Sequence, residues 1–533
     1  MQIKKHQIGF ILALLLLVLS ACAGGDDAES QSGGEGSGTD SEASGGDLIL
    51  AVLSDASSLD PHGGKDVPTS VVLKNIYEPL VKTGDNNEIE PSLAESWEAV
   101  DETTYSFKLR EGVTFHDGEP FNAEAVKTNI DRLLDEELGS PSYNLFQMIT
   151  DIEVVGEYEV EISTEFPFSP LLSHLSHNSG GMISPAVIEA DYEAIENGED
   201  PFAYVSANPV GTGFMEFESW DPGSEVVLSK YEDYWGEPAH VDTITFRVVP
   251  DSQVRLADLE TGNVHIIDPV QPTEVSRIEN SDEAHIHQQA GSSIAYLGFN
   301  TEKEPFNNPV VRQAISHAID REAIISGIYE DYAIPATGPI APGIFGYSEN
   351  VEAIEYDMDE ARALLEEAGM GEGFTTSIWT NDNPQRQSIA VLVQEALAEL
   401  NIEASIEVME FGAYIDQTAA GEHDMFILGH SNPTGDADYQ MYTLFHSSQK
   451  GNPGNRSFYE NAEVDELLDE ARRESDPDQR KEIYEDAGQI LVEEAPMAFL
   501  LHQEYLLGVA DSVTGFDIDE AGIYDLKDVK IEQ

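Results

Sequence analysis

Residues 104–126 read TYSFKLREGVTFHDGEPFNAEAV. Apolar and polar residues alternate over 105–109, which predicts a strand with one apolar face. Asp117-Gly118 predicts a turn, because this pair of residues tolerates the backbone angles of tight turns. Asn122 is typical of a helix N-cap, and apolar residues follow it at helical spacing from Val126. The stretch carries no catalytic group, so it informs about the fold.

This stretch, with Ala94-Glu95-Ser96-Trp97 before it, resembles the signature of the family 5 extracellular solute-binding proteins, the peptide- and nickel-binding receptors of ABC importers. Three further segments resemble the glutathione-binding subgroup of that family: GMISPA at 181–186, NPVGTG at 208–213 and IPATG at 334–338. The resemblance implies an α/β, two-lobed periplasmic-binding-protein (Venus-flytrap) fold with mixed sheets and an extra subdomain in a large first lobe. It implies no enzymatic activity and no cofactor.

The same resemblance predicts how the chain is divided. The first lobe spans 48–298 in two subdomains, the second lobe spans 299–500, and the segment 501–533 returns to complete the first lobe. Helices and strands alternate through the second lobe, as expected of an α/β architecture. The two chain crossings are expected near Asn300 and Leu501.

The N-terminus predicts export and a lipid anchor. Lys4 and Lys5 precede an apolar run over 8–19, which is typical of a signal peptide and short for a membrane span. Leu19-Ser20-Ala21-Cys22 resembles a bacterial lipobox, so we expect a signal peptide over 1–21 and lipidation of Cys22. The alternative is an ordinary signal peptide with a bystander cysteine. A disordered acidic Gly/Ser tether is expected over 22–47, because this stretch has almost nothing to bury.

Composition limits the possible partners. The 533 residues include 102 Asp and Glu against 26 Lys and Arg, a formal net charge of −76. Nucleic acid is excluded as a partner, because its binding requires clustered Lys and Arg. The carboxylates indicate a solvated surface suited to high salt or an alkaline medium. Cys22 is the only cysteine, so the mature chain has no disulfide and no thiol nucleophile.

In the second lobe, the loop after the strand predicted at 425–429 is the main candidate for ligand binding. The resemblance implies that dipeptide receptors have a tryptophan at the position of His430 and an aspartate near Pro433, and both are replaced here. Asp436 or Asp438 is then the candidate partner for a ligand ammonium group. The alternative is that the two aspartates cap a helix starting at Tyr439. The loop residues predicted to bind ligand are His430, Ser431, Asn432, Asp436, Asp438 and Tyr439.

Other loops add candidates from both lobes. Arg386 follows Trp379 near the place where dipeptide receptors keep an arginine for the ligand carboxylate, and a guanidinium can hold a carboxylate bidentately. The alternative for Arg386 is a helix-surface position. From the first lobe we expect ligand contacts from the loop after the opening strand and from a glycine-rich segment, at Ser54, Asp55, Asn178, Ser179, Gly181 and Met182.

Three functions follow from these observations. The first is a monomeric, lipid-anchored receptor that captures a short peptide, with glutathione as one candidate, outside the cell and delivers it to a permease and its ATPase. The second is a nickel or nickel-chelate receptor, motivated by His174, His177 and His430, since imidazole suits nickel. The third is a secreted serine hydrolase, although no Gly-x-Ser-x-Gly motif is present.

Overall fold

The computed structural model describes residues 45–64, 66–84, 88–452 and 454–532. The predicted signal peptide, Cys22 and most of the predicted tether lie outside these residues. Among the described helices, none combines the length and the apolar character needed to cross a membrane.

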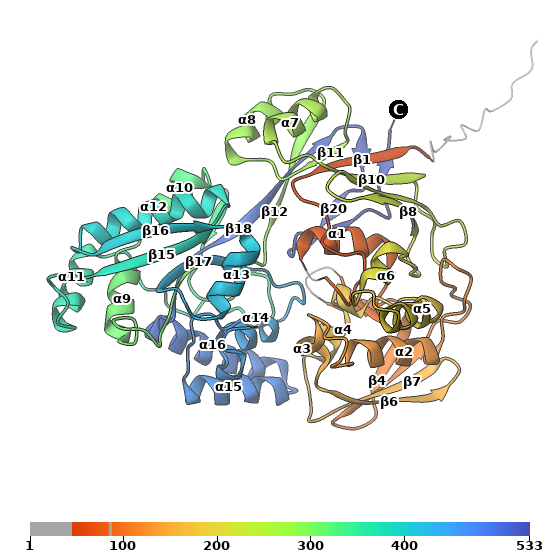
Figure 1. Cartoon of the computed structure of the whole chain (residues 1–533), viewed down its shortest axis with the longest axis horizontal. Coiled ribbons are helices and arrows are strands. Elements are labelled where there is room, and N and C mark those ends of the chain that lie inside the picture. Colours follow the sequence, from red (N-terminus) through yellow and green to blue (C-terminus); the bar gives the residue numbers. More distant parts are fainter. Residues whose placement is uncertain (1–44, 65, 85–87, 453, 533) are drawn as a thin grey trace, which may run out of the picture. The chain divides into compact units, whose positions relative to one another are not determined.

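A mixed sheet of twelve strands forms the core of both lobes (Figure 1). Strand β1 (Asp47–Val52) lies between β10 (Thr243–Val248) and β11 (Ile266–Asp268), and it is parallel to both. The sheet continues from β10 to an antiparallel hairpin of β9 (Glu225–Lys230) and β8 (Met215–Asp221), as predicted from the turn between them. Helices α1 (Val67–Ile76), α7 (Ser252–Glu260) and α8 (Val275–Glu279) complete this part of the first lobe.

The predicted strand and helix at 104–126 belong to a second unit of the first lobe. Its antiparallel sheet has the order β4 (Ala94–Ala99), β5 (Thr104–Leu109), β7 (Glu159–Thr164) and β6 (Ile149–Gly156). Helix α2 (Ala123–Leu133) packs against β6 and β7, and Asn122 caps it by accepting the Ala125 N–H at 3.1 Å. The remaining elements of this region are β2 (Val81–Thr83), β3 (Ile89–Pro91), α3 (Tyr143–Phe146), α4 (Leu171–Leu175), the 3₁₀ helix η2 (Asn178–Gly180), α5 (Pro185–Glu196) and α6 (Ala203–Ala207).

The second lobe is built on β13 (Ile294–Phe299), β17 (Met425–His430), β15 (Thr375–Asn381) and β16 (Glu403–Met409), in that spatial order. The predicted helices and strands of this lobe are present with ends shifted by one to three residues. Its helices are α9 (Pro309–His317), α10 (Arg321–Ile328), α11 (Met358–Glu367), α12 (Pro384–Ala398), α13 (Phe411–Ala419), α14 (Ala437–Phe445), α15 (Ala462–Arg473) and α16 (Pro477–Glu494). The short strand β14 (Ala333–Pro335) pairs with β18.

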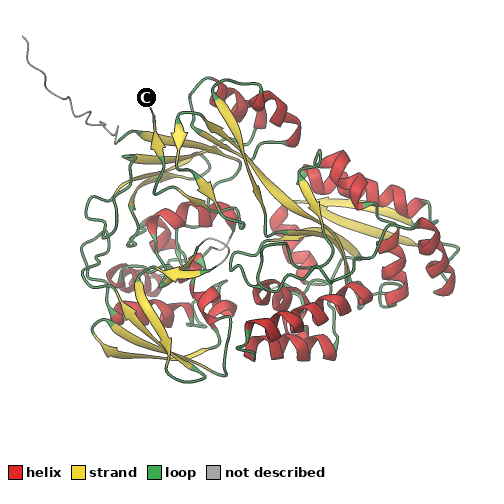
Figure 2. Ribbon diagram, turned by 180° about the vertical axis from the view of Figure 1, so that it is seen from behind, coloured by secondary structure: helices red, strands yellow, loops and turns green. Residues whose placement is uncertain are grey.

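The apolar run 497–501 predicts a short strand. Strand β18 (Met497–Ala510) is much longer, and it runs through the sheets of both lobes (Figure 2). Its first half pairs with β13, and its second half pairs with β11 and β12 (Ala284–Ala290). The other crossing lies between β12 and β13, where the Gly291 N–H donates to the Gln503 carbonyl at 3.0 Å. It therefore precedes Asn300, because β13 pairs with β17 along its whole length. Short strands β19 (Val513–Thr514), β20 (Asp517–Ile518), β21 (Tyr524–Asp525) and β22 (Lys530–Ile531) follow.

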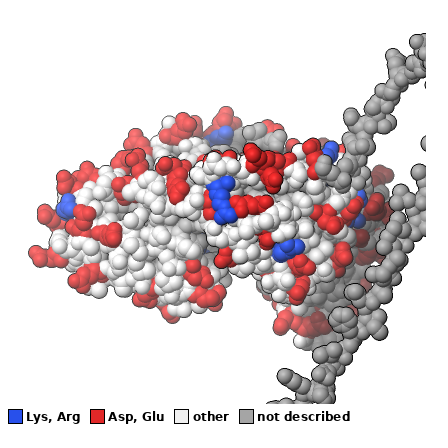
Figure 3. Space-filling model, turned by 90° about the horizontal axis from the view of Figure 1, so that it is seen from above, with Lys and Arg blue, Asp and Glu red and all other residues white. Residues whose placement is uncertain are grey.

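Carboxylates are much more frequent than basic side chains on the face of the molecule that Figure 3 shows. In the view of that figure, Asp and Glu side chains are scattered over the whole described face, and Lys and Arg occur singly among them. No continuous basic stripe crosses this face.

Candidate functional site

The predicted ligand loop lies at the carboxyl end of β17, and its two aspartates are paired with arginines. Asp436 caps α14 by accepting the Asp438 N–H at 2.9 Å, and Gly435 before it has a φ of 66° that favours glycine. The Asp436 carboxylate binds the Arg480 guanidinium bidentately at 2.6 and 2.7 Å. Asp438 accepts from Arg472 at 2.8 and 3.0 Å. Both aspartates are buried, so their charges already have fixed partners.

Asp438 also joins the two lobes. His174 on α4 of the first lobe places its Nε2 atom 3.3 Å from Asp438 Oδ2, with both side chains almost fully buried. Although burial opposes ionisation of Asp438, Arg472 and His174 together lower the pKa of its carboxyl. Two backbone-directed bonds lie nearby, because the N–H and Oγ of Ser169 donate to the carbonyls of Arg472 and Glu474 at 2.9 and 2.6 Å. Asp438 therefore belongs to a buried polar contact between the two lobes.

An aromatic contact accompanies this ion pair. The Tyr439 ring stacks on His430 at a centroid distance of 5.3 Å and on His177 of the first lobe at 6.2 Å, with interplanar angles of 26°. Burial raises the pKa of Tyr439 to about 12. The structure thus brings His177 of the first lobe against two residues of the predicted ligand loop.

The other residues predicted from the glycine-rich segment of the first lobe are mostly internal. Ser179 pairs with the Ser142 hydroxyl at 2.7 Å, and Met182 is part of the hydrophobic core below. A Cβ atom on Gly181 would lie 2.8 Å from the Cβ of Tyr77, so this glycine permits close packing. Asn178 is half-buried, and its Nδ2 atom has no hydrogen-bond partner among the residues that the structure describes. Of these four residues, Asn178 is the one whose side chain has a buried donor without a hydrogen-bond partner among the described residues.

Arg386 lies against the predicted loop. It sits in the first turn of α12, whose N-cap Asn383 accepts its N–H at 3.0 Å. A Cβ atom on Gly429 would be 3.4 Å from its Nη2 atom, so the guanidinium packs on the residue before His430. Among the described residues, its side chain donates to Asn381 Oδ1 at 3.1 Å and has no carboxylate within ion-pair distance. The half-buried guanidinium is therefore available to a ligand anion.

Trp379 on β15 and the first-lobe pair Ser54-Asp55 occupy different surroundings. Trp379 is 8% exposed within the second-lobe core. Asp55 accepts from the Trp220 indole N–H at 3.1 Å and from the Gly223 N–H at 2.7 Å, so the β8–β9 hairpin holds it. Ser54 is exposed beside it.

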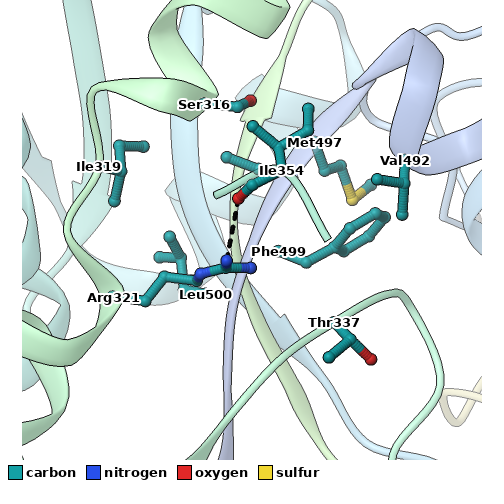
Figure 4. Close-up of a pocket in the computed structure, with 10 residues that line it drawn as sticks. Ser316, Ile319, Arg321, Thr337, Ile354, Val492, Met497, Phe499 and Leu500 are labelled. Atoms are coloured by element: carbon teal, nitrogen blue, oxygen red, sulfur yellow. Dashed lines mark hydrogen bonds between the residues drawn. The ribbon is translucent and has the colours of Figure 1, made fainter. Parts of the chain in front are cut away.

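The second lobe contains a small internal cavity that is too small to hold a ligand. It has a volume of about 20 Å³, room for roughly one water molecule. Arg321 reaches across it and donates to the Ile354 carbonyl at 2.9 Å (Figure 4). The space is filled by the protein's own side chains and leaves no room for a peptide.

The residues 88–452 match the family described as bacterial extracellular solute-binding proteins, family 5 Middle. The chain belongs to this family. It is 34% identical over 481 residues to the glutathione-binding protein GsiB of Escherichia coli K12, covering 88% of this chain and 91% of that protein.

Two solved family 5 relatives support the fold. The periplasmic binding protein DppA of Helicobacter pylori, solved with the peptide STSA, is 33% identical, with a TM-score of 0.83 over 92% of this chain and 99% of its own. The oligopeptide-binding protein AppA of Bacillus subtilis, solved with a nonapeptide, is 26% identical, with a TM-score of 0.81 over 92% of this chain and 100% of its own. The expected two-lobed α/β fold is confirmed.

Sequence reasoning did not single out the return segment, which the structure connects to the ligand loop through Ser292. Asp519 is exposed, and its carboxyl accepts the N–H groups of Ala521 and Ile523 at 2.9 Å. Desolvation raises the pKa of the Asp519 carboxyl to about 6. The next residue, Glu520, accepts the Ser292 N–H at 2.6 Å, and Ser292 Oγ donates to Asn432 of the ligand loop at 3.0 Å. No local pattern connects this segment to the ligand loop, because Ser292 and Asn432 are distant from it in the sequence.

The nickel hypothesis depends on three histidines, His174, His177 and His430, and these make contacts of two different kinds in the structure. His174 Nδ1 lies 2.8 Å from the Leu145 carbonyl, and its Nε2 faces Asp438, while His177 and His430 stack on Tyr439. Across the described ranges, no group of three His, Cys, Asp or Glu residues has the geometry to hold a metal ion.

Proposed function

We propose that this protein is the receptor of an ABC importer that captures a short peptide outside the cell and delivers it to a membrane permease. Membership of family 5 carries the receptor class, and relatives named for glutathione and oligopeptide binding, with a third solved with the peptide STSA, support a peptide ligand. The ligand lies between the lobes, at the loop that begins with His430, Ser431 and Asn432. Tyr439, Asn178 and Arg386 contribute further contacts there.

In this proposal the two ends of the peptide meet opposite charges. Arg386 binds the terminal carboxylate, because its guanidinium faces the loop without an anionic partner among the described residues. Asp519 binds the α-amino group, because its exposed carboxyl is next to Glu520, which is bonded through Ser292 to Asn432 of the ligand loop. Asp436 and Asp438, predicted from sequence to take this second role, have buried arginine partners instead.

The role of Arg386 gives the first prediction. Replacing Arg386 by Gln is expected to weaken binding of a free peptide by about 1.5–3 kcal/mol, roughly 10- to 150-fold in Kd, because a charge-assisted hydrogen bond is lost. Isothermal titration with di- to pentapeptides, glutathione and Ni²⁺ measures this change. A C-terminally amidated peptide should bind wild type as weakly as the free peptide binds the variant.

The matched control for that experiment is Arg362→Gln, which removes an arginine paired with Asp359 and Glu399 on the surface of the same lobe. It should leave peptide affinity unchanged. If the Arg386→Gln variant binds the free peptide and the amidated peptide equally, and both with the affinity of wild type for the free peptide, Arg386 is excluded from the site. If the titration detects binding of Ni²⁺ and of no peptide, the ligand is a metal ion or a metal chelate and not a peptide.

We also propose that Cys22 carries the lipid that holds the receptor at the outer face of the cell membrane. More than one acyl chain makes such an anchor stable. The full chain expressed in a bacterial host should incorporate labelled fatty acid and sediment with membranes. The Cys22→Ala variant should do neither and appear in the soluble exported fraction. Membrane retention of that variant without label would contradict the lipid anchor.

A further inference from the structure

The first lobe contains a cavity of about 160 Å³ at the carboxyl-terminal edge of its sheet, where the parallel strands end. The cavity lies between the sheet strands β1, β9, β10 and β11 and the first turns of α1. Its lining is mainly aliphatic and aromatic. The side chains that set its shape are Val67, Val71 and Val72 of α1 and Val226, Phe246 and Val248 of the sheet.

Its position in the fold is that of a ligand site. The cavity touches Val52, Val248 and Asp268, which are the last residues of the parallel strands β1, β10 and β11. Ligands of α/β sheets bind outside the carboxyl ends of the strands. Leu53 at the same edge is 46% exposed, so an apolar side chain is left open to solvent beside the cavity.

The return segment links this cavity to the proposed peptide site. Tyr524 lines the cavity and donates its hydroxyl to Asp268. On the same segment, the Ala521 carbonyl accepts from Tyr505, and Glu520 is bonded to Ser292, which holds Asn432 of the ligand loop. The cavity and the ligand loop are therefore connected by one short chain of contacts.

The size and charge of the cavity restrict what it can hold. An apolar cavity of about 150 Å³ stays dry and accepts a benzene-sized molecule. Two carboxylates, Asp55 and Asp268, lie at its wall, and neither has a cationic partner within ion-pair distance among the described residues. An anionic group would be repelled there, and an uncharged polar group would lose its hydrogen bonds to water.

We propose that this cavity is a specificity subsite that takes one branched aliphatic or aromatic side chain of the bound peptide. This inference rests on the proposed function and deepens it. Glutathione has no side chain that fills such a space, since it offers only a short thiol and a zwitterionic γ-glutamyl group. The receptor should accordingly prefer a peptide with a Leu, Ile or Phe residue.

The test is isothermal titration with matched peptide sets, tri- to pentapeptides in which a single residue at each position in turn is Gly, Leu, Phe or Asp. At one position, Leu or Phe should bind about 10- to 150-fold more tightly than Gly, as expected for burial of a large apolar side chain. Asp at that position should bind more weakly than Gly.

Two variants locate the effect in the cavity. Val248→Phe adds a ring at a half-buried position in its wall and should reduce the Leu-to-Gly affinity ratio towards one. Val72→Ala enlarges the space and should shift the preference from Leu towards Phe. Val254→Phe, at a side chain 48% exposed on α7, is the control and should leave both ratios at their wild-type values.

The possible outcomes separate this inference from the proposed function. Peptide binding without any position that prefers Leu or Phe overturns the subsite alone. A preference that Val248→Phe and Val72→Ala leave unchanged places the apolar side chain elsewhere and also overturns it. No binding of any peptide overturns the proposed function and this inference with it.

Discussion

Replacing Arg132 by Met is expected to lower the free energy of unfolding by about 3–5 kcal/mol, because it leaves buried carboxylates without a partner. Arg132 on α2 donates from Nη2 to Asp60 and to Asp191, at 2.6 Å in each case, and all three side chains are fully buried. Its Nη1 atom lies 3.2 Å from Asp60 and 2.9 Å from His62. The three acidic and basic groups join α2, α5 and the segment after β1.

Urea unfolding followed by circular dichroism measures this loss. The control is Arg277→Met, because Arg277 forms a bidentate pair with Glu260 that is half-exposed and contributes little. A midpoint for the Arg132 variant equal to that of the control would show that the buried network does not support the fold. Replacing Arg132, Asp60 and Asp191 together by apolar residues of similar size should restore part of the loss.

Replacing Asp438 by Asn is expected to have a similarly large effect on stability, about 3–5 kcal/mol, because Arg472 would remain buried without its anion. It would also remove the charge that His174 approaches from the first lobe. The exposed Asp469→Asn variant on α15 serves as the control and should unfold at the wild-type midpoint.

The Asp438 effect should depend on pH with a defined sign. The pKa of this carboxyl is lowered in the folded state, against about 3.9 in an unfolded chain. Its contribution is therefore fully present above about pH 4 and is lost as the pH falls towards its lower folded value. The stability difference between wild type and Asp438→Asn should shrink below pH 4 and stay constant from pH 5 to 8.

The Asp438→Asn variant also distinguishes a structural role of Asp438, as the partner of Arg472, from a role in binding the ligand ammonium group. A structural role predicts that the folded variant still binds free peptides more tightly than N-acetylated ones. A variant that keeps wild-type stability and loses this discrimination would instead make Asp438 the partner of the ligand ammonium group. Asp519→Asn should show that loss of discrimination without the loss of stability.

Much of the architecture follows from short-range patterns. The caps at Asn122 and Asn308 each bond an N–H two or three residues ahead, so a few neighbouring residues suffice to predict where α2 and α9 begin. The turn residues Asp221-Pro222-Gly223-Ser224 likewise predict the β8–β9 hairpin from local sequence. The length of β18 was underestimated, because its second half is a strand only through pairing with β11 and β12.

The site was predictable in outline and not in its pairings. The sequence by itself determined that a polar loop follows β17 and that the chain resembles a family of exported receptors. Only the tertiary structure decided that Asp436 and Asp438 face arginines 44 and 34 residues away. It also decided that Glu520 is bonded through Ser292 to Asn432 of that loop. The physical reason is range. Caps and turns depend on atoms within one helical turn, whereas ion pairs and cavities depend on how distant elements pack, which no local pattern encodes.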